Sequence, residues 1–327
     1  MIASKDGRET VDVSLFIISY NRAEYLVEAV KSALNQTHRP RDITILDNGS
    51  TPDVKEAVEP LLERGVTWLG SDRTNPPSWN IRRAFTLAQG RYFVAMHDDD
   101  RLVPSFLKEQ ADFLDRNPDV VAVGCNAFRI DAKGNTGGPL VPRSKERISW
   151  FRTSTDVALL YSRSGAIPFP TIMYRNGSAQ KKEFRYDEFG KVLDVIYLCD
   201  LAQVGPLVYR DEMLYKYRLH ADQDSLGIPE LTRRTLDRGL LSYASSNPLI
   251  SRKMKKDLAT KQVLRALTAL GKKFRNDPGP STLFGQIEQI RPDIFTLGGF
   301  ISGILKYNKE LFRYLKKKLE SRSNRMP

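Results

Sequence analysis

Through residue 125 the chain alternates short apolar runs with longer stretches in which apolar residues recur at helical spacing. Residues 13–19 are rich in β-branched side chains, the pattern of a strand buried on both faces. Further strands are expected over residues 43–46, 66–69, 92–96 and 120–123, and helices over residues 23–35, 52–64, 79–88 and 104–116. Strands that alternate with helices predict an α/β fold with a doubly wound, mostly parallel, Rossmann-like sheet and helices on both faces.

The pattern becomes less regular after residue 125. Residues 128–130 are expected to form a strand that enters a turn, residues 145–161 and 192–203 helices, and residues 207–219 a hairpin or a pair of short strands. Beyond Pro229 the apolar residues recur at helical spacing almost throughout. We therefore expect a catalytic domain over residues 1–228 and a helical C-terminal extension over residues 229–327.

The positive charge of the chain lies in this C-terminal extension. Residues 230–327 contain 21 Lys and Arg against 8 Asp and Glu, whereas the rest of the chain contains 30 and 31. An amphipathic basic helix over residues 295–319 would suit an anionic membrane surface, or it would pack on the catalytic domain or on a second subunit of a homo-oligomer. Nucleic acid is not expected as a partner, because no binding motif or aromatic ladder accompanies the basic residues.

The cysteine content and the hydropathy of the sequence indicate the cellular compartment in which the protein is expected. Cys125 and Cys199 are too few for a disulfide framework or a cysteine-based zinc site. Residues 1–11 are polar and lack the apolar stretch of a signal peptide. No window contains about 18 consecutive apolar residues, as a membrane-spanning helix would need. We expect a cytoplasmic protein, with any membrane association being peripheral and on the inner face.

Three polar clusters follow predicted strands. They are residues 19–22 (Ser-Tyr-Asn-Arg), 47–50 (Asp-Asn-Gly-Ser) and 97–100 (His-Asp-Asp-Asp). In open α/β sheets, ligands bind beyond the carboxyl ends of the strands. The three clusters are therefore expected to form one binding edge.

The acidic triplet is the sharpest of these signals. Three consecutive carboxylates repel one another without a counter-charge, which Mn²⁺ or Mg²⁺ would supply. The alternative is a solvated acidic turn that caps the following helix. If the strand continues, alternation places Asp98 and Asp100 on the same side, so we expect these two to bind metal. Asp99 is then expected to bind a ribose hydroxyl or the backbone.

Three segments make the sequence resemble a known family. VSLFIISYNRAEYLVEAVKSALNQT, DITILDNGST and GRYFVAMHDDDRLVP occur in the order and form typical of the inverting family 2 glycosyltransferases of the GT-A fold. The resemblance covers roughly residues 11–225. It implies transfer of a sugar from a nucleoside diphosphate donor, with UDP as the first choice, and a divalent metal on the diphosphate. The implied acceptor is a hydroxyl of a glycan or lipid-linked acceptor, in the synthesis of a cell-surface polysaccharide.

The resemblance also assigns roles on the donor side. Tyr20 and Asn21 fall where the family lines its base pocket, and Asp47 matches the acid that contacts the nucleobase or ribose. The Asp47 cluster is also ordinary turn chemistry, and the two roles are compatible. Asn75 matches an Asn in the loop over the donor, although Pro77 replaces the usual Gly of that loop.

Further donor-side residues follow from the same match. Arg82 is a candidate for contact with the diphosphate, the alternative being an arginine on the surface of a helix. Asp98, Asp99 and Asp100 match the family's metal-binding triplet. His97 stands where many members carry another carboxylate.

The second half of the domain is expected to supply the catalytic base. Asp194 matches the family's base, which takes the proton of the acceptor hydroxyl; the alternative is a helix N-cap. His220 matches a family histidine that would be a third metal ligand or a phosphate donor, or else a structural residue. Arg218 is expected to stabilise the departing diphosphate, since a guanidinium group suits phosphate geometry.

Two other functions compete with this hypothesis. A sugar-phosphate nucleotidyltransferase also uses a doubly wound sheet and acidic metal ligands, but the sequence lacks a Gly-rich phosphate-binding loop before the first helix. A non-catalytic, membrane-associated assembly protein that binds sugar nucleotides is the other alternative. The presence of Asp47, Asp98, Asp100 and Asp194 argues against it.

Overall fold

The structure is a computed structural model that describes residues 9–163, 165–220, 229–259 and 261. The strands are β1 (Thr10–Ser19), β2 (Arg39–Asp47), β3 (Val66–Leu69), β4 (Tyr92–His97), β5 (Arg101–Leu102), β6 (Ala122–Ile130), β7 (Thr136–Pro139), β8 (Ile148–Phe151), β9 (Met173–Arg175) and β10 (Leu207–Arg218). The α-helices are α1 (Ala23–Leu34), α2 (Pro52–Leu62), α3 (Ser78–Leu87), α4 (Phe106–Arg116), α5 (Ser154–Ser162), α6 (Asn176–Ala179), α7 (Tyr186–Phe189), α8 (Leu193–Leu201) and α9 (Glu230–Ser242). Two 3₁₀ turns, η1 (Phe169–Thr171) and η2 (Gly190–Val192), complete the elements.

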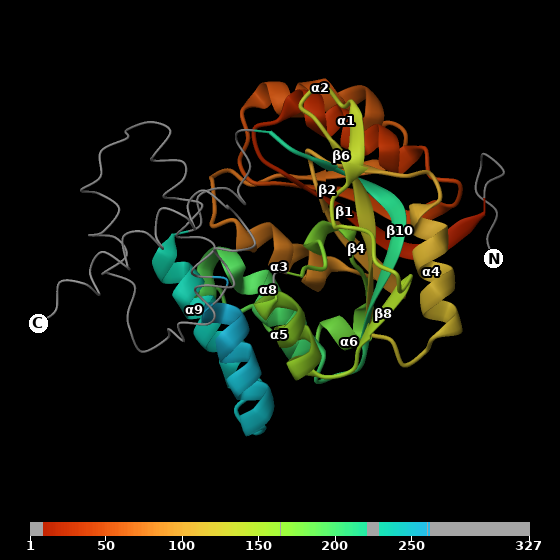
Figure 1. Ribbon diagram of the computed structural model, residues 1–327. Coiled ribbons are helices and arrows are strands. Elements are labelled where there is room, and N and C mark those ends of the chain that lie inside the picture. Colours follow the sequence, from red (N-terminus) through yellow and green to blue (C-terminus); the bar gives the residue numbers. More distant parts are fainter. Residues whose placement is uncertain (1–8, 164, 221–228, 260, 262–327) are drawn as a thin grey trace, which may run out of the picture. The chain divides into compact units, whose positions relative to one another are not determined.

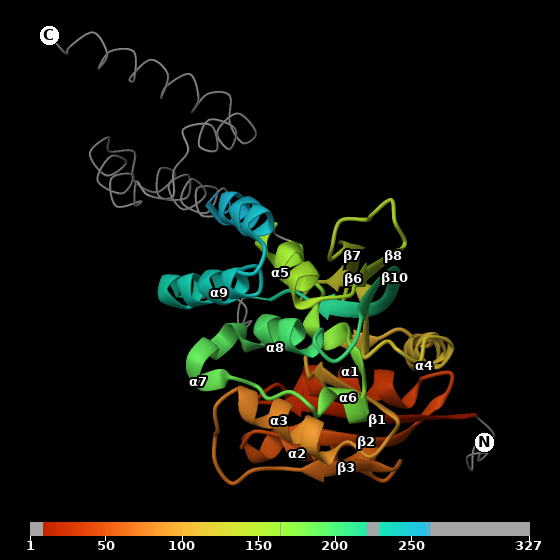
Figure 2. The same ribbon diagram turned by 90° about the horizontal axis from the view of Figure 1, so that it is seen from below.

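The strands form one sheet in the order β3-β2-β1-β4-β9-β6-β10-β5, with β7 beside β6 and β8 beside β10. The strands β3, β2, β1 and β4 run parallel, as do β6 and β10, and β9 is antiparallel to both neighbours. Figure 2 shows β1, β2 and β3 side by side. The α/β fold with a central, mostly parallel sheet is confirmed, because buried apolar strands pair in parallel when helices cover both faces.

Helices cover both faces of the sheet. On one face, Leu15 of β1 packs with Leu26 of α1 in a continuous core that includes apolar residues of α2 and α4. On the other face, the ring of Phe85 on α3 lies 4.6 Å from that of Phe93 on β4 and 5.2 Å from that of Tyr197 on α8. Figure 1 shows α4 on one side of β4, and α3 and α8 on the other.

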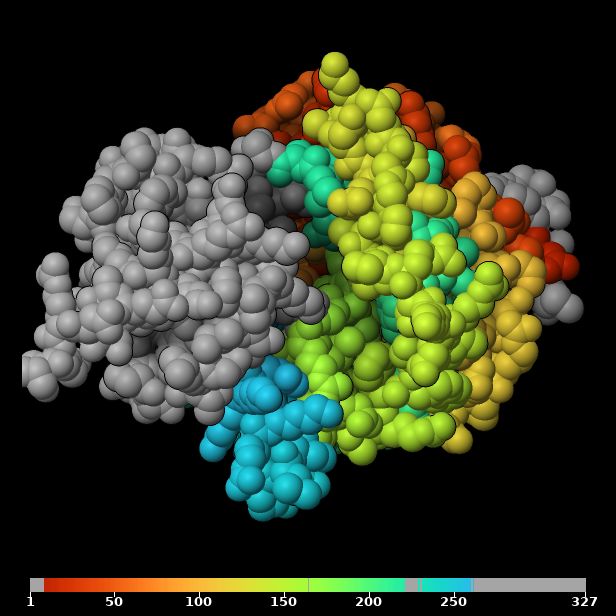
Figure 3. Space-filling view, viewed as in Figure 1, coloured from red at the N-terminus to blue at the C-terminus, as the bar shows by residue number. Residues whose placement is uncertain are grey.

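The helix expected over residues 145–161 begins later than predicted. Residues 148–151 form β8 instead, because their β-branched and aromatic side chains pair with β10. The helix starts at Ser154, where Asp156 accepts hydrogen bonds from the backbone N–H groups of Arg152 and Thr153. The expectation was therefore wrong for its first part. Figure 3 shows the yellow-green segment with β7 and β8 on the surface of the molecule.

The hairpin or pair of short strands expected over residues 207–219 is a single strand, β10. Its register is irregular between Arg210 and Met213 and again before Tyr215. Residues 207–210 pair with β8, whereas residues 215–216 pair with β5. Local irregularities of this kind bend a strand, so β10 changes its partner without reversing direction.

The chain divides into two compact units. The first comprises residues 1–158 and 165–239, and the second residues 159–164 and 240–327. Within the second unit, Arg163 pairs with Asp257 at 3.1 Å, and residues 248–259 are helical. The domain boundary expected between residues 228 and 229 stays a prediction, and the amphipathic helix expected over residues 295–319 lies outside the described residues. In the described part, no helix is long and apolar enough to cross a membrane.

Candidate functional site

The register of the parallel strands brings the polar clusters together. Ser19 at the end of β1 is paired with Asp47 of β2, and Ile18 is paired with His97 of β4. The N–H of Asp98 continues this pairing by donating to the carbonyl of Ile18 at 3.0 Å. The three clusters that follow β1, β2 and β4 therefore share one edge of the sheet, as predicted from the position of ligands in open α/β sheets.

Asp98 is buried beneath this edge, with 1% of its surface exposed. One carboxylate oxygen accepts the backbone N–H of Tyr20 at 2.9 Å, and the other accepts a guanidinium N–H of Arg22 at 3.0 Å. Burial raises the pKa of Asp98 to about 7, although Arg22 favours the ionised form. In this geometry Asp98 holds the turn between β1 and α1.

The group that can hold a metal ion consists of His97, Asp99 and Asp100. One ligand atom from each lies within 4.8 Å of the others. The strand ends at His97, so the alternation expected to pair Asp98 with Asp100 does not continue, and Asp99 joins the group instead. One imidazole nitrogen and two carboxylate oxygens fit a divalent cation such as Mn²⁺, whereas Mg²⁺ more often takes oxygen ligands alone.

The two carboxylates of this group have opposite electrostatic surroundings. Burial and the neighbouring charge of Asp99 raise the pKa of Asp100 well above its ordinary value. Burial also opposes ionisation of Asp99, but His97, His220 and Arg22 outweigh it and lower the pKa of Asp99. The partners of Asp99 therefore favour its ionised form.

Strand β10 fixes the orientation of Asp100. The hydroxyl of Tyr215 donates to one carboxylate oxygen at 3.0 Å, and the backbone N–H of Arg218 donates to the other at 2.9 Å. These donors leave further lone pairs of both oxygens available to a metal ion. Asp100 is therefore held rigidly although it lies in the loop after β4.

Arg218 is buried, with 1% of its surface exposed. Its Nε donates to the carbonyl of Asp99 at 2.7 Å, and Nη1 donates to the carbonyls of residues 131 and 132, each at 3.1 Å. Its Nη2 pairs with Glu28 of α1. The expected contact with a departing diphosphate would require the guanidinium to leave these partners, so the geometry favours a structural role.

His220 lies beside the metal-capable group through Asp99. Its Nε2 is 2.9 Å from a carboxylate oxygen of Asp99, and its ring centroid is 5.6 Å from that of Tyr25. It is not one of the three residues whose ligand atoms cluster. Its role as a third metal ligand stays a prediction.

Asp47 closes the turn that follows β2. Its carboxylate accepts the backbone N–H groups of Gly49 and Ser50 at 3.0 and 2.9 Å, and it also pairs with the Ser50 hydroxyl. That hydroxyl in turn accepts the N–H of Asn21 at 2.9 Å, and Asn21 adopts a positive φ of 52°. The Asp47 cluster thus forms a turn, as one of its two interpretations predicted. The hydrogen bond from Asn21 to Ser50 joins this turn to the cluster of residues 19–22. Tyr20 is 43% exposed at the same edge.

A reciprocal pair joins Asn75 to this turn. The Asn48 amide donates to the Asn75 carbonyl at 3.0 Å, and its oxygen accepts the Asn75 N–H at 3.1 Å. Gly49 has a φ of 77°, and a Cβ atom there would lie 2.6 Å from the carbonyl carbon of Arg73. Only glycine allows this approach, so the loop before α3 is held against the β2 turn.

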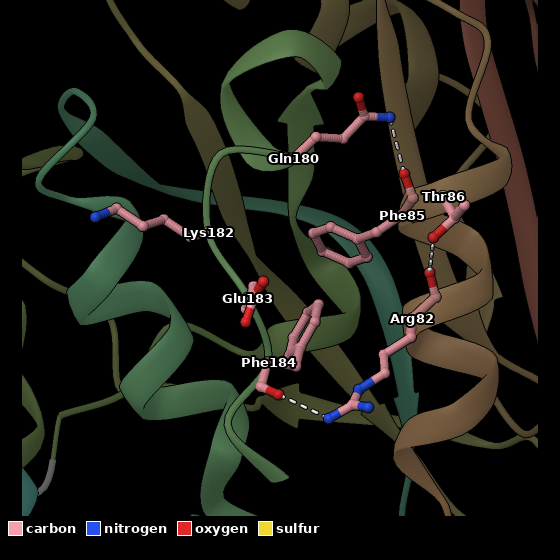
Figure 4. A pocket seen from close by; sticks show the side chains of 7 residues that line it. All are labelled: Arg82, Phe85, Thr86, Gln180, Lys182, Glu183 and Phe184. Atoms are coloured by element: carbon pink, nitrogen blue, oxygen red, sulfur yellow. Dashed lines mark hydrogen bonds between the residues drawn. The ribbon is translucent and has the colours of Figure 1, made fainter.

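Within the described residues, Arg82 and Asp194 are not hydrogen-bonded to the side chains of the three polar clusters. Arg82 donates to the carbonyl of Phe184 at 2.8 Å and lines a cavity of about 560 Å³ with Phe85, Phe184 and neighbouring side chains (Figure 4). Asp194 occupies the first turn of α8, partly buried, and burial raises its pKa to about 6. Their expected roles stay predictions.

Sequence reasoning gave no metal role to His97, which belongs to the metal-capable group, and it missed three further residues of the site. Arg22 pairs with Asp98 and Asp99, Tyr215 donates to Asp100, and Glu28 accepts from Arg218. Arg22 belongs to the polar cluster of residues 19–22, and Tyr215 lies three residues before Arg218, so their position was a usable signal. Glu28 carries no such signal, because it lies in the middle of a predicted helix.

Comparison with known proteins assigns the family. The glycosyl transferase family 2 profile matches residues 14–179, about half of the chain, and the chain belongs to this family. It is therefore a glycosyltransferase.

Individual relatives are distant. A glycosyltransferase of Haemophilus influenzae, described as uncharacterized, is 23% identical over 65% of this chain and 67% of its own length. Chondroitin synthase of Escherichia coli is 24% identical over 65% of this chain, which spans only 30% of that longer protein. The solved structure of residues 1–349 of S. aureus TarS in complex with UDP has a TM-score of 0.59 at 16% identity, covering 89% of this chain and 80% of that chain. This likeness supports the fold.

Proposed function

We propose that the protein transfers a sugar from a nucleoside diphosphate donor, UDP in the first instance, to a hydroxyl of a glycan or lipid-linked acceptor. The transfer inverts the anomeric centre and depends on a divalent metal. The observation that carries this proposal is the metal-capable group His97, Asp99 and Asp100 at the edge where the ends of β1 and β2 also meet. A diphosphate needs a cation, and this edge is where α/β sheets bind nucleotides.

The relatives support the proposed substrates. Chondroitin synthase is named for making a polysaccharide, and the TarS structure is named for its complex with UDP. These names support a role for this chain in synthesis of a cell-surface polysaccharide, with UDP in its donor. The family match also favours this function over sugar-phosphate nucleotidyl transfer.

A metal ion at this group would be held by His97, Asp99 and Asp100, with His220 beside it. When bound, the ion neutralises the charge of the donor diphosphate. The chain itself fixes the ligands, because β10 orients Asp100 and His220 orients Asp99. The nitrogen ligand leads us to expect Mn²⁺ to be preferred over Mg²⁺.

Asp194 is the proposed general base. An inverting transfer is a single displacement, so a carboxylate on the acceptor side takes the proton of the attacking hydroxyl. A pKa near 6 leaves Asp194 largely ionised at neutral pH while making it a stronger base than an exposed aspartate. Tyr20, Asn21, Asp47 and Asn75 are proposed to line the nucleoside side of the same edge.

Nucleotide binding tests the donor site. We expect UDP, among UDP, GDP, dTDP and CDP, to raise the melting temperature of the protein only when Mn²⁺ is present, because a ligand of the folded state stabilises it. Asp100→Ala should abolish this shift. Asp112→Ala is the matched control, since Asp112 pairs with Lys108 on the surface of α4. A full shift in the Asp100 variant would reject the metal site, and binding without transfer to any acceptor would favour the non-catalytic alternative.

A further inference from the structure

The positively charged side chain of Arg22 lies beside both Asp98 and Asp99. The Nη1 of Arg22 lies 3.0 Å from Oδ1 of Asp98 and 3.5 Å from Oδ2 of Asp99. Arg22 precedes α1, so its backbone is fixed by the turn that Asp98 and Ser50 hold. A buried carboxylate next to a second carboxylate requires such a partner.

The side chain of Arg22 is more exposed than that of the other arginine of the site. The side chain of Arg22 is 23% exposed, whereas that of Arg218 is 1% exposed and points its donors at fixed carbonyls and at Glu28. Because part of its side chain faces solvent, Arg22 can adopt another rotamer that leaves one carboxylate and keeps the other. Arg218 has no comparable alternative in this geometry.

Arg22 and a metal ion would compete for the same carboxylate, that of Asp99. The Oδ2 of Asp99 faces both Arg22 and the Nε2 of His220, which lies at 2.9 Å. Asp99 is also one of the three residues of the metal-capable group. A divalent cation bound by Asp99 would share this carboxylate with the guanidinium, and neighbouring like charges repel strongly in a partly buried site.

We propose that Arg22 is an internal counter-ion that competes with the metal for Asp99 and, once displaced, turns to the diphosphate of the donor. This inference rests on the proposed function, because it needs both the metal and the diphosphate. Asp98 keeps its bond to Arg22 and acts as the pivot. A guanidinium group is well shaped for a diphosphate, so the displaced side chain gains a new anionic partner.

The consequence is coupling between two ligands. The metal alone binds weakly, since it must displace Arg22 without compensation. The metal and the diphosphate together bind cooperatively, because the diphosphate accepts the displaced guanidinium. This coupling is reciprocal, so Mn²⁺ must raise the affinity for UDP by the same factor as UDP raises the affinity for Mn²⁺.

Arg22→Met removes the charge and keeps the length of the side chain. We expect the variant to bind Mn²⁺ alone at least tenfold more tightly than the wild type, measured by electron paramagnetic resonance of free Mn²⁺. We also expect UDP to raise its Mn²⁺ affinity by a smaller factor than in the wild type. Arg91→Met is the matched control, because Arg91 lies just before β4 and pairs with Asp115 at the surface. It should change neither quantity.

Other outcomes overturn the inference. Unchanged or weaker Mn²⁺ binding by Arg22→Met, with the wild-type response to UDP, would reject the competition while leaving the proposed metal site intact. Absence of Mn²⁺ binding by the wild type, with and without UDP, would reject both. If Arg22→Met does not fold, Arg22→Met combined with Asp98→Asn removes both charges of the pair. The absence of tighter Mn²⁺ binding in that double variant would also reject the inference.

Discussion

Asp194 is the residue whose chemistry can be followed most directly through pH. Its pKa, raised by burial to about 6, means that the carboxylate becomes protonated as the pH falls below 6. A protonated base cannot accept the proton of the acceptor, so kcat/KM should fall about tenfold per pH unit below pH 6. Asp194→Asn should lower kcat by roughly 100- to 10,000-fold and leave the affinity for UDP unchanged.

The control for this prediction lies on the same helix. Asp200 pairs with Arg185 at 3.1 Å, and Asp200→Asn should retain both the rate and the acid limb of the profile. A rate that stays flat down to pH 5 in the wild type would remove Asp194 from the role of base.

The buried contacts of Arg218 predict that it stabilises the fold. Arg218→Lys should lower the free energy of unfolding by about 3 kcal/mol, because a lysine cannot replace a guanidinium that bonds in several directions and would leave buried carbonyls without partners. Urea unfolding measures this loss, with the exposed Arg41→Lys as control. Unchanged stability together with weaker UDP binding would instead place Arg218 on the donor.

Sequence patterns predicted the types of residue in the site better than their partners. The Asp triplet and the Tyr20 and Asp47 clusters were found, because polar residues after apolar strands mark a binding edge. Which carboxylates face each other was not predictable, since that depends on β4 ending at His97. The partners of Asp100 come from β10, more than a hundred residues away in the sequence.

At the scale of elements, the contact between the β2 turn and the loop before α3 is the part that can be tested. Asn48→Ala removes both hydrogen bonds to Asn75 and should raise the dissociation constant of UDP by about tenfold, because the loop must then be ordered on binding. The kcat at saturating donor should stay the same. Calorimetric titration of UDP with Mn²⁺ measures the change.

Asn117→Ala provides the comparison, because the Asn117 amide bonds within the end of α4. An unchanged dissociation constant for Asn48→Ala would show that the loop does not depend on this pair.

Elements with a strong local pattern were predicted closely, as α1, α2 and α4 show. The errors at β8 and β10 have one physical cause: both depend on pairing with a distant strand. Residues 148–151 become a strand through β10, and β10 stays unbroken because β8 and β5 each pair with a different part of it. A helical or turn pattern in the local sequence contains no information about these partners.

At the scale of the whole molecule, the uneven distribution of charge yields a prediction. Residues 230–327 have a large excess of Lys and Arg, and anionic lipids attract such segments. The full chain should sediment with vesicles that contain phosphatidylglycerol and not with vesicles of phosphatidylcholine alone. Salt at about 1 M should release it, because the Debye length falls to about 3 Å. Equal sedimentation with both vesicles would contradict peripheral attachment through charge.

The bonds of Asp100 also have a consequence for the order in which the protein is made. Its partner Arg218 follows it by 118 residues. At the usual pace of translation, roughly 5–20 residues per second, the ribosome takes about 6–24 s to reach Arg218 after it has made Asp100. During that interval the nascent chain can form the first strands, but Asp100 lacks both donors that β10 supplies. The hydrogen bonds that orient Asp100 are therefore completed only when β10 emerges, and a chain released early lacks them.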